Sequence, residues 1–179
     1  MKINPNLSGM GNLLALVNAA NPGKNFTALQ VSVTSVSART PDTTPYNTEA
    51  VLTGTPDGPY KQDQTVFYNR RSVIDAVDAP QVSYIVTSDT TVDDLLAAVC
   101  TALKIIQTEV ELVDMTTAEN ATVSNMILQP TANSKLYNDT LIVQLTWSGD
   151  DVAESVAALW AGDQLDRLIN ITMPGRGYL

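Results

Sequence analysis

The chain has 179 residues, of which 44% are hydrophobic and only 16% are charged, and its net charge at pH 7 is −9. This size suits one domain with a real core, or two small related halves. An acidic surface with a pI near 4.2 repels phosphate backbones, so we expect no direct binding to nucleic acid. Thr, Ser, Asn and Gln replace the missing charges, which fits a surface that packs against neighbours or a plain Thr-rich β domain.

The sequence contains no histidine and a single cysteine, Cys100. A Ser-His-Asp triad, a Cys-His pair and imidazole metal ligands are therefore excluded. Cys100 falls on the apolar face of a predicted helix, where we interpret it as a small buried hydrophobe. No stretch has the length of a membrane span, and the apolar run 13–17 is too short for a secretory signal, so we expect no membrane contact.

Charge is distributed unevenly along the chain. Residues 1–41 contain Lys2, Lys24 and Arg39 but no acid, so this segment carries +3 and the remainder −12. One hypothesis is that the N-terminal segment lies against the acidic surface of a neighbouring copy. The alternative is that it lies on the body of its own chain.

In the first half, a helical pattern is followed by strand patterns. A short helix is predicted over 11–20, and Asn21-Pro22-Gly23 ends it because proline cannot continue the hydrogen-bond ladder. Alternating apolar residues, Leu29, Val31 and Val33 among them, then predict a strand over 26–36. Further on, we expect loops at 38–47 and 54–59, strands at 50–53, 65–68 and 82–86, and a short apolar turn or strand at 73–77.

The stretch 90–114 organises the second half. Apolar residues at helical spacing predict a helix over 93–106, with Thr91 as N-cap and two acids in the first turn. The period then changes to two at Val110 and Leu112, which predicts a strand directly after the helix. Beyond it we expect a polar loop at 115–124, a short apolar stretch at 126–128, a turn at 129–133, a strand at 140–147, a helix at 150–162 and an open tail at 170–179.

Two regions of the sequence echo each other. Asn12–Val17 resembles Asp94–Val99, and both Tyr60 and Tyr137 precede a valine by six positions. A duplicated helix-strand-loop-strand unit in halves 10–80 and 90–147 would produce this pattern, as would chance similarity between short elements. We therefore expect a single α+β domain over 1–179, with a mixed or antiparallel sheet packed by two or three helices.

The search for chemistry yields few candidates. The acid pairs Asp93-Asp94 and Asp150-Asp151 stand at predicted helix starts, where capping explains them. Arg70 and Arg71 could hold a phosphate or carboxylate, or pair with the many acids. The tail 175–179 could dock into a partner or be a frayed terminus. We predict no catalytic, cofactor-binding or metal-binding residue, and hence no enzyme.

Two segments carry a resemblance to a known group of proteins. They are Tyr60-Lys61-Gln62-Asp63-Gln64-Thr65-Val66-Phe67-Tyr68-Asn69-Arg70 and Asn133-Ser134-Lys135-Leu136-Tyr137-Asn138-Asp139-Thr140-Leu141-Ile142-Val143. Both are similar to segments of small virion structural proteins of large tailed bacteriophages, in which Gly tends to stand at the place of Asp139. The resemblance implies a component of the tail, neck, baseplate or capsid surface, repeated around a symmetry axis. It implies no catalytic residue.

Three functional hypotheses follow. The first is a non-enzymatic virion component, made in the host cytoplasm, which associates with other virion proteins and with copies of itself in a ring or array. Loops 38–59 and 115–133 and both termini would then carry the contacts. The alternative is a carbohydrate- or receptor-binding module that uses exposed Tyr46, Tyr60, Tyr137 and Tyr178. A hydrolase with an acid pair ranks last.

Overall fold

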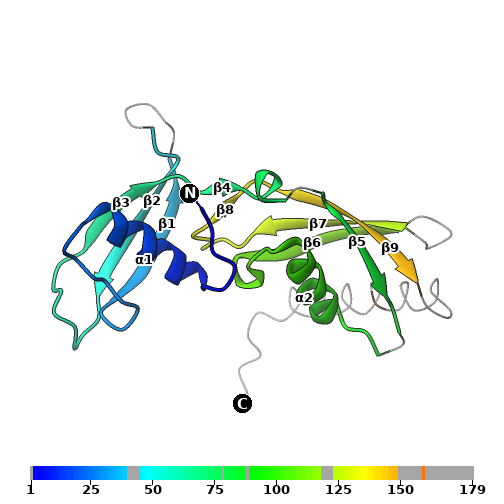
Figure 1. Ribbon diagram of the computed structural model, residues 1–179, viewed down its shortest axis with the longest axis horizontal. Helices are drawn as coiled ribbons and strands as arrows, with labels where there is room; N and C mark the ends of the chain where they lie inside the picture. The colour runs from blue at the N-terminus through cyan, green and yellow to red at the C-terminus, as the bar shows by residue number, and fades with distance from the viewer. Residues whose placement is uncertain are drawn as a thin grey trace, which may run out of the picture.

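The computed structural model describes residues 2–39, 45–77, 79–87, 89–117, 123–148 and 159. They form two α+β lobes that lie end to end, each with a helix packed on one face of a sheet (Figure 1). The N-terminal lobe spans residues 9–68 and the C-terminal lobe residues 71–148. This confirms the predicted α+β class with mixed and antiparallel sheets.

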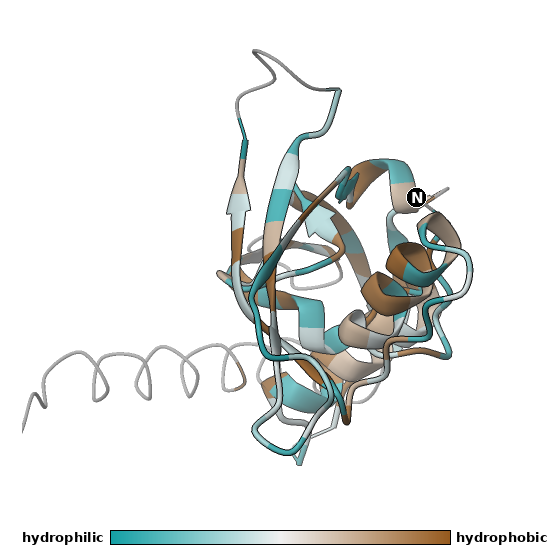
Figure 2. Cartoon of the chain, turned by 90° about the vertical axis from the view of Figure 1, so that its left-hand side faces the viewer, coloured by the Kyte–Doolittle hydropathy of each residue, from teal (hydrophilic) through white to brown (hydrophobic). Residues whose placement is uncertain are grey.

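The N-terminal lobe is a helix followed by an antiparallel meander. Its elements are α1 (Gly9–Ala20), β1 (Val31–Ala38), β2 (Thr48–Gly54) and β3 (Gln64–Tyr68), with sheet order β1-β2-β3. Helix α1 begins where the Ser8 hydroxyl accepts a bond from Gly11 N at 3.1 Å, and it ends at Asn21. Its apolar side covers one face of the sheet (Figure 2), and the shared core contains Leu13, Val17, Ala50, Leu52 and Tyr68.

The C-terminal lobe holds a four-stranded mixed sheet. Its elements are β4 (Arg71–Ser72), η1 (Ile74–Ala76), β5 (Gln81–Ile85), α2 (Val92–Leu103), η2 (Gln107–Glu109), β6 (Val110–Thr117), β7 (Val123–Pro130), β8 (Tyr137–Asn138) and β9 (Leu141–Ser148). The sheet order is β5-β9-β7-β6, in which β5 runs parallel to β9 and the other pairs are antiparallel. Strands β4 and β8 form a separate parallel pair.

Helix α2 confirms the predicted N-cap and acidic first turn. The Thr91 hydroxyl accepts from Asp94 N at 3.2 Å, and the Asp94 carboxylate accepts from Thr91 N at 3.2 Å, which is a capping box. The Thr91 hydroxyl also donates to Asp94 Oδ2 at 2.6 Å, and this bond, together with the one from Thr91 N, lowers the pKa of Asp94. Cys100 is buried on the inner face of the helix, as predicted, and burial raises the pKa of its thiol to about 12.

Three boundary predictions were wrong. The strand predicted over 26–36 begins only at Val31, because Gln30 N and Val31 N both bond Thr27 O in a turn that leaves Leu29 88% exposed. The helix predicted to 106 ends at Leu103, since Lys104 adopts a left-handed conformation with φ 57°. The loop predicted over 115–124 is strand at both ends, because β6 and β7 pair there, and the buried Ser124 accepts the Trp147 indole N–H at 2.7 Å.

Residues near the two termini contact the C-terminal lobe. Ile3 packs against the core of that lobe, and Asn4 N bonds the Asn12 side chain at 2.7 Å. The segment 2–8 thus contacts its own chain, and the contact of the basic segment 1–41 with a neighbouring copy stays a prediction. Leu159 is helical and buried in the same core, while the rest of the predicted helix 150–162 and the tail 170–179 lie outside the described residues.

Candidate functional site: an open sheet edge beside an apolar groove

A half-open groove of about 740 Å³ lies between α1 and β3 in the N-terminal lobe. This volume falls within the range of about 300–1,000 Å³ that is usual for ligand pockets. Its apolar wall includes Leu16, Val17, Phe26, Leu52, Tyr60 and Val66. Lys24 and Lys61 also line it, so the groove combines an apolar floor with two basic side chains.

Local contacts fix the position of Tyr60 in this groove. Its ring packs against Phe26, with ring centroids 4.8 Å apart. The Asn18 amide holds Phe26 in turn, donating to Phe26 O at 3.0 Å and accepting from Phe26 N at 2.8 Å. A Cβ at Gly54 would stand 1.8 Å from Tyr60 O, so glycine is required where the loop folds back on β2.

Strand β3 is an open edge of the three-stranded sheet. Among the described residues it pairs only with β2, and the register of that pair is regular from Gln64 to Tyr68. The other edge, β1, carries a bulge between Val33 and Ser35. Bulges and charges discourage the pairing of edge strands with other chains, and β3 has neither over its length.

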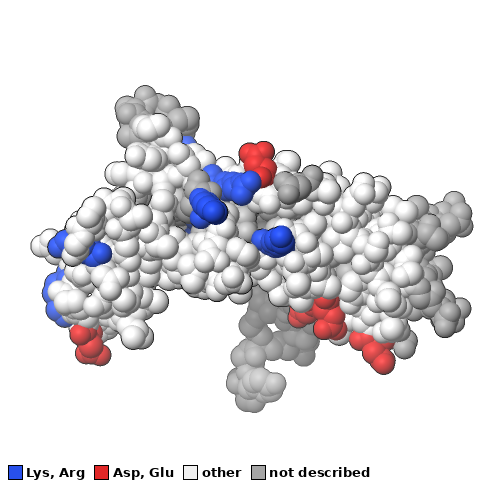
Figure 3. All heavy atoms as spheres, in the orientation of Figure 1, with Lys and Arg blue, Asp and Glu red and all other residues white. Residues whose placement is uncertain are grey.

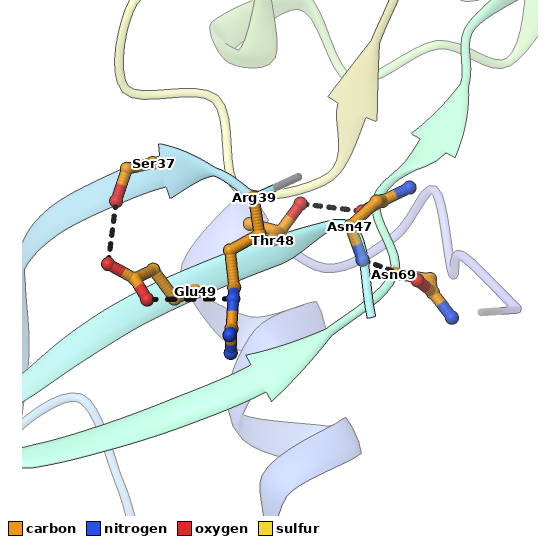
Figure 4. Close-up of polar contacts among 6 residues, drawn as sticks. All are labelled: Ser37, Arg39, Asn47, Thr48, Glu49 and Asn69. Atoms are coloured by element: carbon orange, nitrogen blue, oxygen red, sulfur yellow. Dashed lines mark hydrogen bonds and ion pairs between the residues drawn. The ribbon is translucent and has the colours of Figure 1, made fainter. Parts of the chain in front are cut away.

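The outer face of the same sheet carries hydroxyl side chains, an ion pair and an exposed aromatic ring. The Ser37 hydroxyl donates to Glu49 Oε1 at 3.3 Å, and Arg39 Nε lies 3.9 Å from Glu49 Oε2 (Figure 4). The Arg39 guanidinium also lies 4.5 Å above the ring of Phe67, which is 45% exposed. Figure 3 shows that most of the visible surface of the molecule carries neither acid nor base. Such a surface needs little desolvation of charge to pack against another chain.

The two lobes meet at a buried carboxylate. Glu109 Oε2 accepts from Ser134 Oγ at 2.9 Å, from Leu136 N at 3.2 Å and from Lys135 N. Its other oxygen, Oε1, lies beside Gly9, and a Cβ added to that glycine would stand only 1.6 Å from this oxygen. The carboxylate therefore lies directly against the start of α1, where the helix dipole favours negative charge.

Arg70 also ties the lobes together. Its Nε donates to Thr48 Oγ1 at 3.1 Å in β2, and its Nη1 donates to Ser134 O at 3.2 Å in the other lobe. Arg71 donates to the backbone carbonyl of Asp75. In the described part of the chain, neither arginine forms an ion pair, so the prediction that they pair with acids was wrong there.

The tyrosines proposed for ligand contact have different environments. Tyr46 is 40% exposed and Tyr60 lines the groove, but Tyr137 is only 1% exposed and its hydroxyl accepts from Ile106 N at 3.3 Å. Tyr137 therefore cannot serve as an exposed platform, which corrects that prediction. Tyr178 lies outside the described residues. Sequence reasoning missed Phe67, since it belongs to a strand whose outward face could not be identified.

The acid pairs show no convergent site. Asp93 and Asp94 occupy the first turn of α2, whereas Asp150 and Asp151 are not described. Across residues 2–39, 45–77, 79–87, 89–117, 123–148 and 159, no three Cys, Asp or Glu side chains gather as metal ligands would. Within those ranges, too, none of the helices has the length and hydropathy needed to cross a bilayer.

Fold and groove together define an α+β protein in which, over the residues that the structure describes, one sheet edge is unpaired beside an apolar groove. The chain belongs to a family described as a family of unknown function, DUF7941, whose profile matches residues 5–168 and so covers both lobes. No curated protein and no solved structure matches the chain.

Proposed function

We propose that this protein is a non-enzymatic structural component of a bacteriophage particle, placed in the tail, neck, baseplate or capsid surface. It acts by associating with copies of itself and with other particle proteins. The observation that supports this most is the open edge of β3 beside the apolar groove. Exposed edges recruit strands from other chains, and grooves beside them select the side chains of those strands.

The segments that resemble virion proteins occupy matching places in the two lobes. Tyr60–Arg70 lines the groove and forms β3, while Asn133–Val143 forms β8 and enters β9. Asp139 has φ 64°, a left-handed conformation that glycine adopts without strain. This geometry explains why a glycine would be favoured at that place in the proteins that the sequence resembles.

We also propose that the two lobes arose by duplication of one unit, a helix followed by a three-stranded meander. Helices α1 and α2 both have 12 residues, and strands β1 and β6 both have 8. Each of these strands has a register shift after its third residue, Val33 or Leu112. In the pair β1-β2, the residue after β2 bonds the residue before β1, from Thr55 N to Gln30 O. In the pair β6-β7, the residue after β7 bonds the residue before β6 in the same way, from Thr131 N to Glu109 O.

Size-exclusion chromatography with light scattering on the full chain tests the proposed function. We expect the mass of a ring or a larger array, because no described segment of the chain covers the open edge and groove, and we propose that another copy does. A strict monomer at all concentrations contradicts self-association.

The alternative function is a carbohydrate- or receptor-binding module. Tyr46 and Phe67 are exposed aromatic rings of the kind that stack on sugars, and Tyr60 lines the groove. A glycan array separates this function from the first. A monomer that retains a glycan, and loses it on Phe67→Ala substitution, favours the alternative and contradicts the structural role.

A further inference from the structure

The C-terminal lobe shows how the edge of this kind of meander can be covered. In the proposed duplication, β9 corresponds to β3, the open edge strand of the N-terminal lobe. Residues 71–86 run along β9 and the neighbouring β8. Strand β4 pairs in parallel with β8, and β5 pairs in parallel with β9. Val73, Val82 and Val86 of this covering segment are buried in the same core as α2. The cover is thus a parallel, strand-forming segment that supplies apolar side chains to the core.

The N-terminal lobe has the same edge without that cover. In the described residues, no segment pairs with the outer side of β3. Inward-facing Val66 of β3 lines the groove together with Leu16 and Val17 of α1. The groove therefore lies in the space between helix and edge strand into which a covering strand would insert its side chains.

The chain contains one further segment with the required pattern. Beyond Leu159 lie 20 residues outside the described structure, and within them Ile169, Ile171 and Met173 alternate with Asn170 and Thr172. Pro174 follows directly, which would end strand pairing. This two-residue period is typical of a strand with one apolar face, and its five residues equal the length of β3.

We propose that residues 169–173 of a neighbouring copy add as a parallel strand to the open edge of β3, with Ile169, Ile171 and Met173 inserted into the groove. This inference rests on the proposed self-association and names the segment that makes the contact. The segment itself carries no charge, so its insertion beside Lys24 and Lys61 of the groove desolvates no acid or base of the tail. Donation of a tail to the next copy is a head-to-tail contact, which generates rings or open filaments.

Disulfide trapping between two single-cysteine chains tests this pairing. In full-length chains that carry Cys100→Ala, one chain receives Thr65→Cys on the outward face of β3 and the other Asn170→Cys or Thr172→Cys on the polar face of the tail. Ser35→Cys is the matched control. Ser35 lies on the opposite edge strand, β1, and both Ser35 and Thr65 pair with Val51, so the two residues share one face of the sheet. We expect disulfide-linked dimers with Thr65→Cys and at least about tenfold fewer with Ser35→Cys, a ratio equivalent to roughly 1.4 kcal/mol of preference.

Two further variants separate pairing from a general effect of the tail. Ile171→Asp places a charge in the apolar groove and is expected to reduce trapping about tenfold or more. In chains that trap through Asn170→Cys, Thr172→Asp places the same charge one residue away on the polar face and is expected to leave trapping nearly unchanged. Equal effects of the two substitutions would overturn the alternating register.

The outcomes also distinguish this inference from the proposed function. An assembly that forms while Thr65→Cys traps no more than Ser35→Cys leaves self-association intact and overturns the tail as its contact. A disulfide within a single chain that carries Thr65→Cys and Asn170→Cys together, with the chain a monomer, overturns donation between copies. A monomer without any trapping contradicts both proposals.

Discussion

Single residues at the lobe junction explain features that look arbitrary in the sequence. Glu109 is 4% exposed, yet three hydrogen-bond donors and the start of α1 surround its carboxylate. A buried acid is tolerated only when its oxygens are bonded in this way. Gly9 and Glu109 are therefore parts of one contact, although they are far apart in the chain and neither suggests the other by sequence pattern.

Substitution of Gly9 by alanine tests this contact. The added Cβ must displace a carboxylate that three donors hold, so we expect destabilisation of about 1–3 kcal/mol in urea unfolding. Gly11→Ala is the matched control in the same helix, where the nearest atom to a Cβ is Leu7 Cβ at 3.3 Å. Alanine gains up to about 1 kcal/mol of helix propensity there, so that variant should be near neutral or stabilised. Equal losses in the two variants would contradict the Glu109 contact.

Because the thiol of Cys100 and the phenol of Tyr68 are buried, we expect the protein to lose stability at alkaline pH. Burial raises the pKa of Cys100 from 9.0 and that of Tyr68 from 10.0, each to about 12. The folded state keeps both groups protonated to a higher pH than the unfolded state does. Their contribution to the free energy of unfolding is therefore complete below pH 9 and is lost as the pH rises toward 12. We expect the unfolding free energy to fall over this window, with Cys100 contributing at most about 1.4 kcal/mol per pH unit. Cys100→Ala should lose that part of the slope, and an unchanged slope would contradict the burial argument.

At the scale of elements, helices and strands with a clear apolar period were predicted correctly, and strand ends without such a period were missed. Helix α2 and strand β9 carry clear apolar patterns, and the structure confirms both, including the inward side of Leu141, Val143, Leu145 and Trp147. The ends of β6 and β7 were missed because Thr, Ser and Asn there resemble a loop in composition. Their strand structure comes from pairing across the sheet, which no local pattern contains.

The groove could not be predicted from sequence for the same reason. Its walls come from α1, from β2 and from the segment 59–68, and only the fold brings these together. Tyr60 was singled out as an exposed aromatic, and the structure places it in the groove wall against Phe26. The sequence thus pointed to one member of the groove without showing the groove itself.

Filling the groove tests whether α1 and β3 form a contact surface. Ala20 lies at the exposed end of α1 and lines the groove, so Ala20→Trp should occupy part of it and weaken assembly about tenfold or more. Ala15→Trp is the matched control, since Ala15 is exposed on the same helix away from the groove. Sedimentation velocity at several concentrations measures the effect. Equal weakening by both substitutions would show that the groove is not the contact.

The whole molecule is two similar lobes joined by a polar junction, and among the described residues only the C-terminal lobe has its sheet edge covered by another segment. Arg70 and Glu109 fix the lobes to each other, so the open edge of β3 has a defined direction relative to the C-terminal lobe (Figure 1). With the proposed tail segment as donor and the β3 edge as acceptor, each copy would suit repeated head-to-tail assembly. The family match across residues 5–168 covers both lobes and the β3 edge.

Electron microscopy of the purified full-length chain tests most directly whether the protein works by association. We expect a repeated assembly, a ring or an array, in which the β3 edge of each copy faces its neighbour. Isolated single copies at every concentration, with the β3 edge facing solvent, would contradict the account.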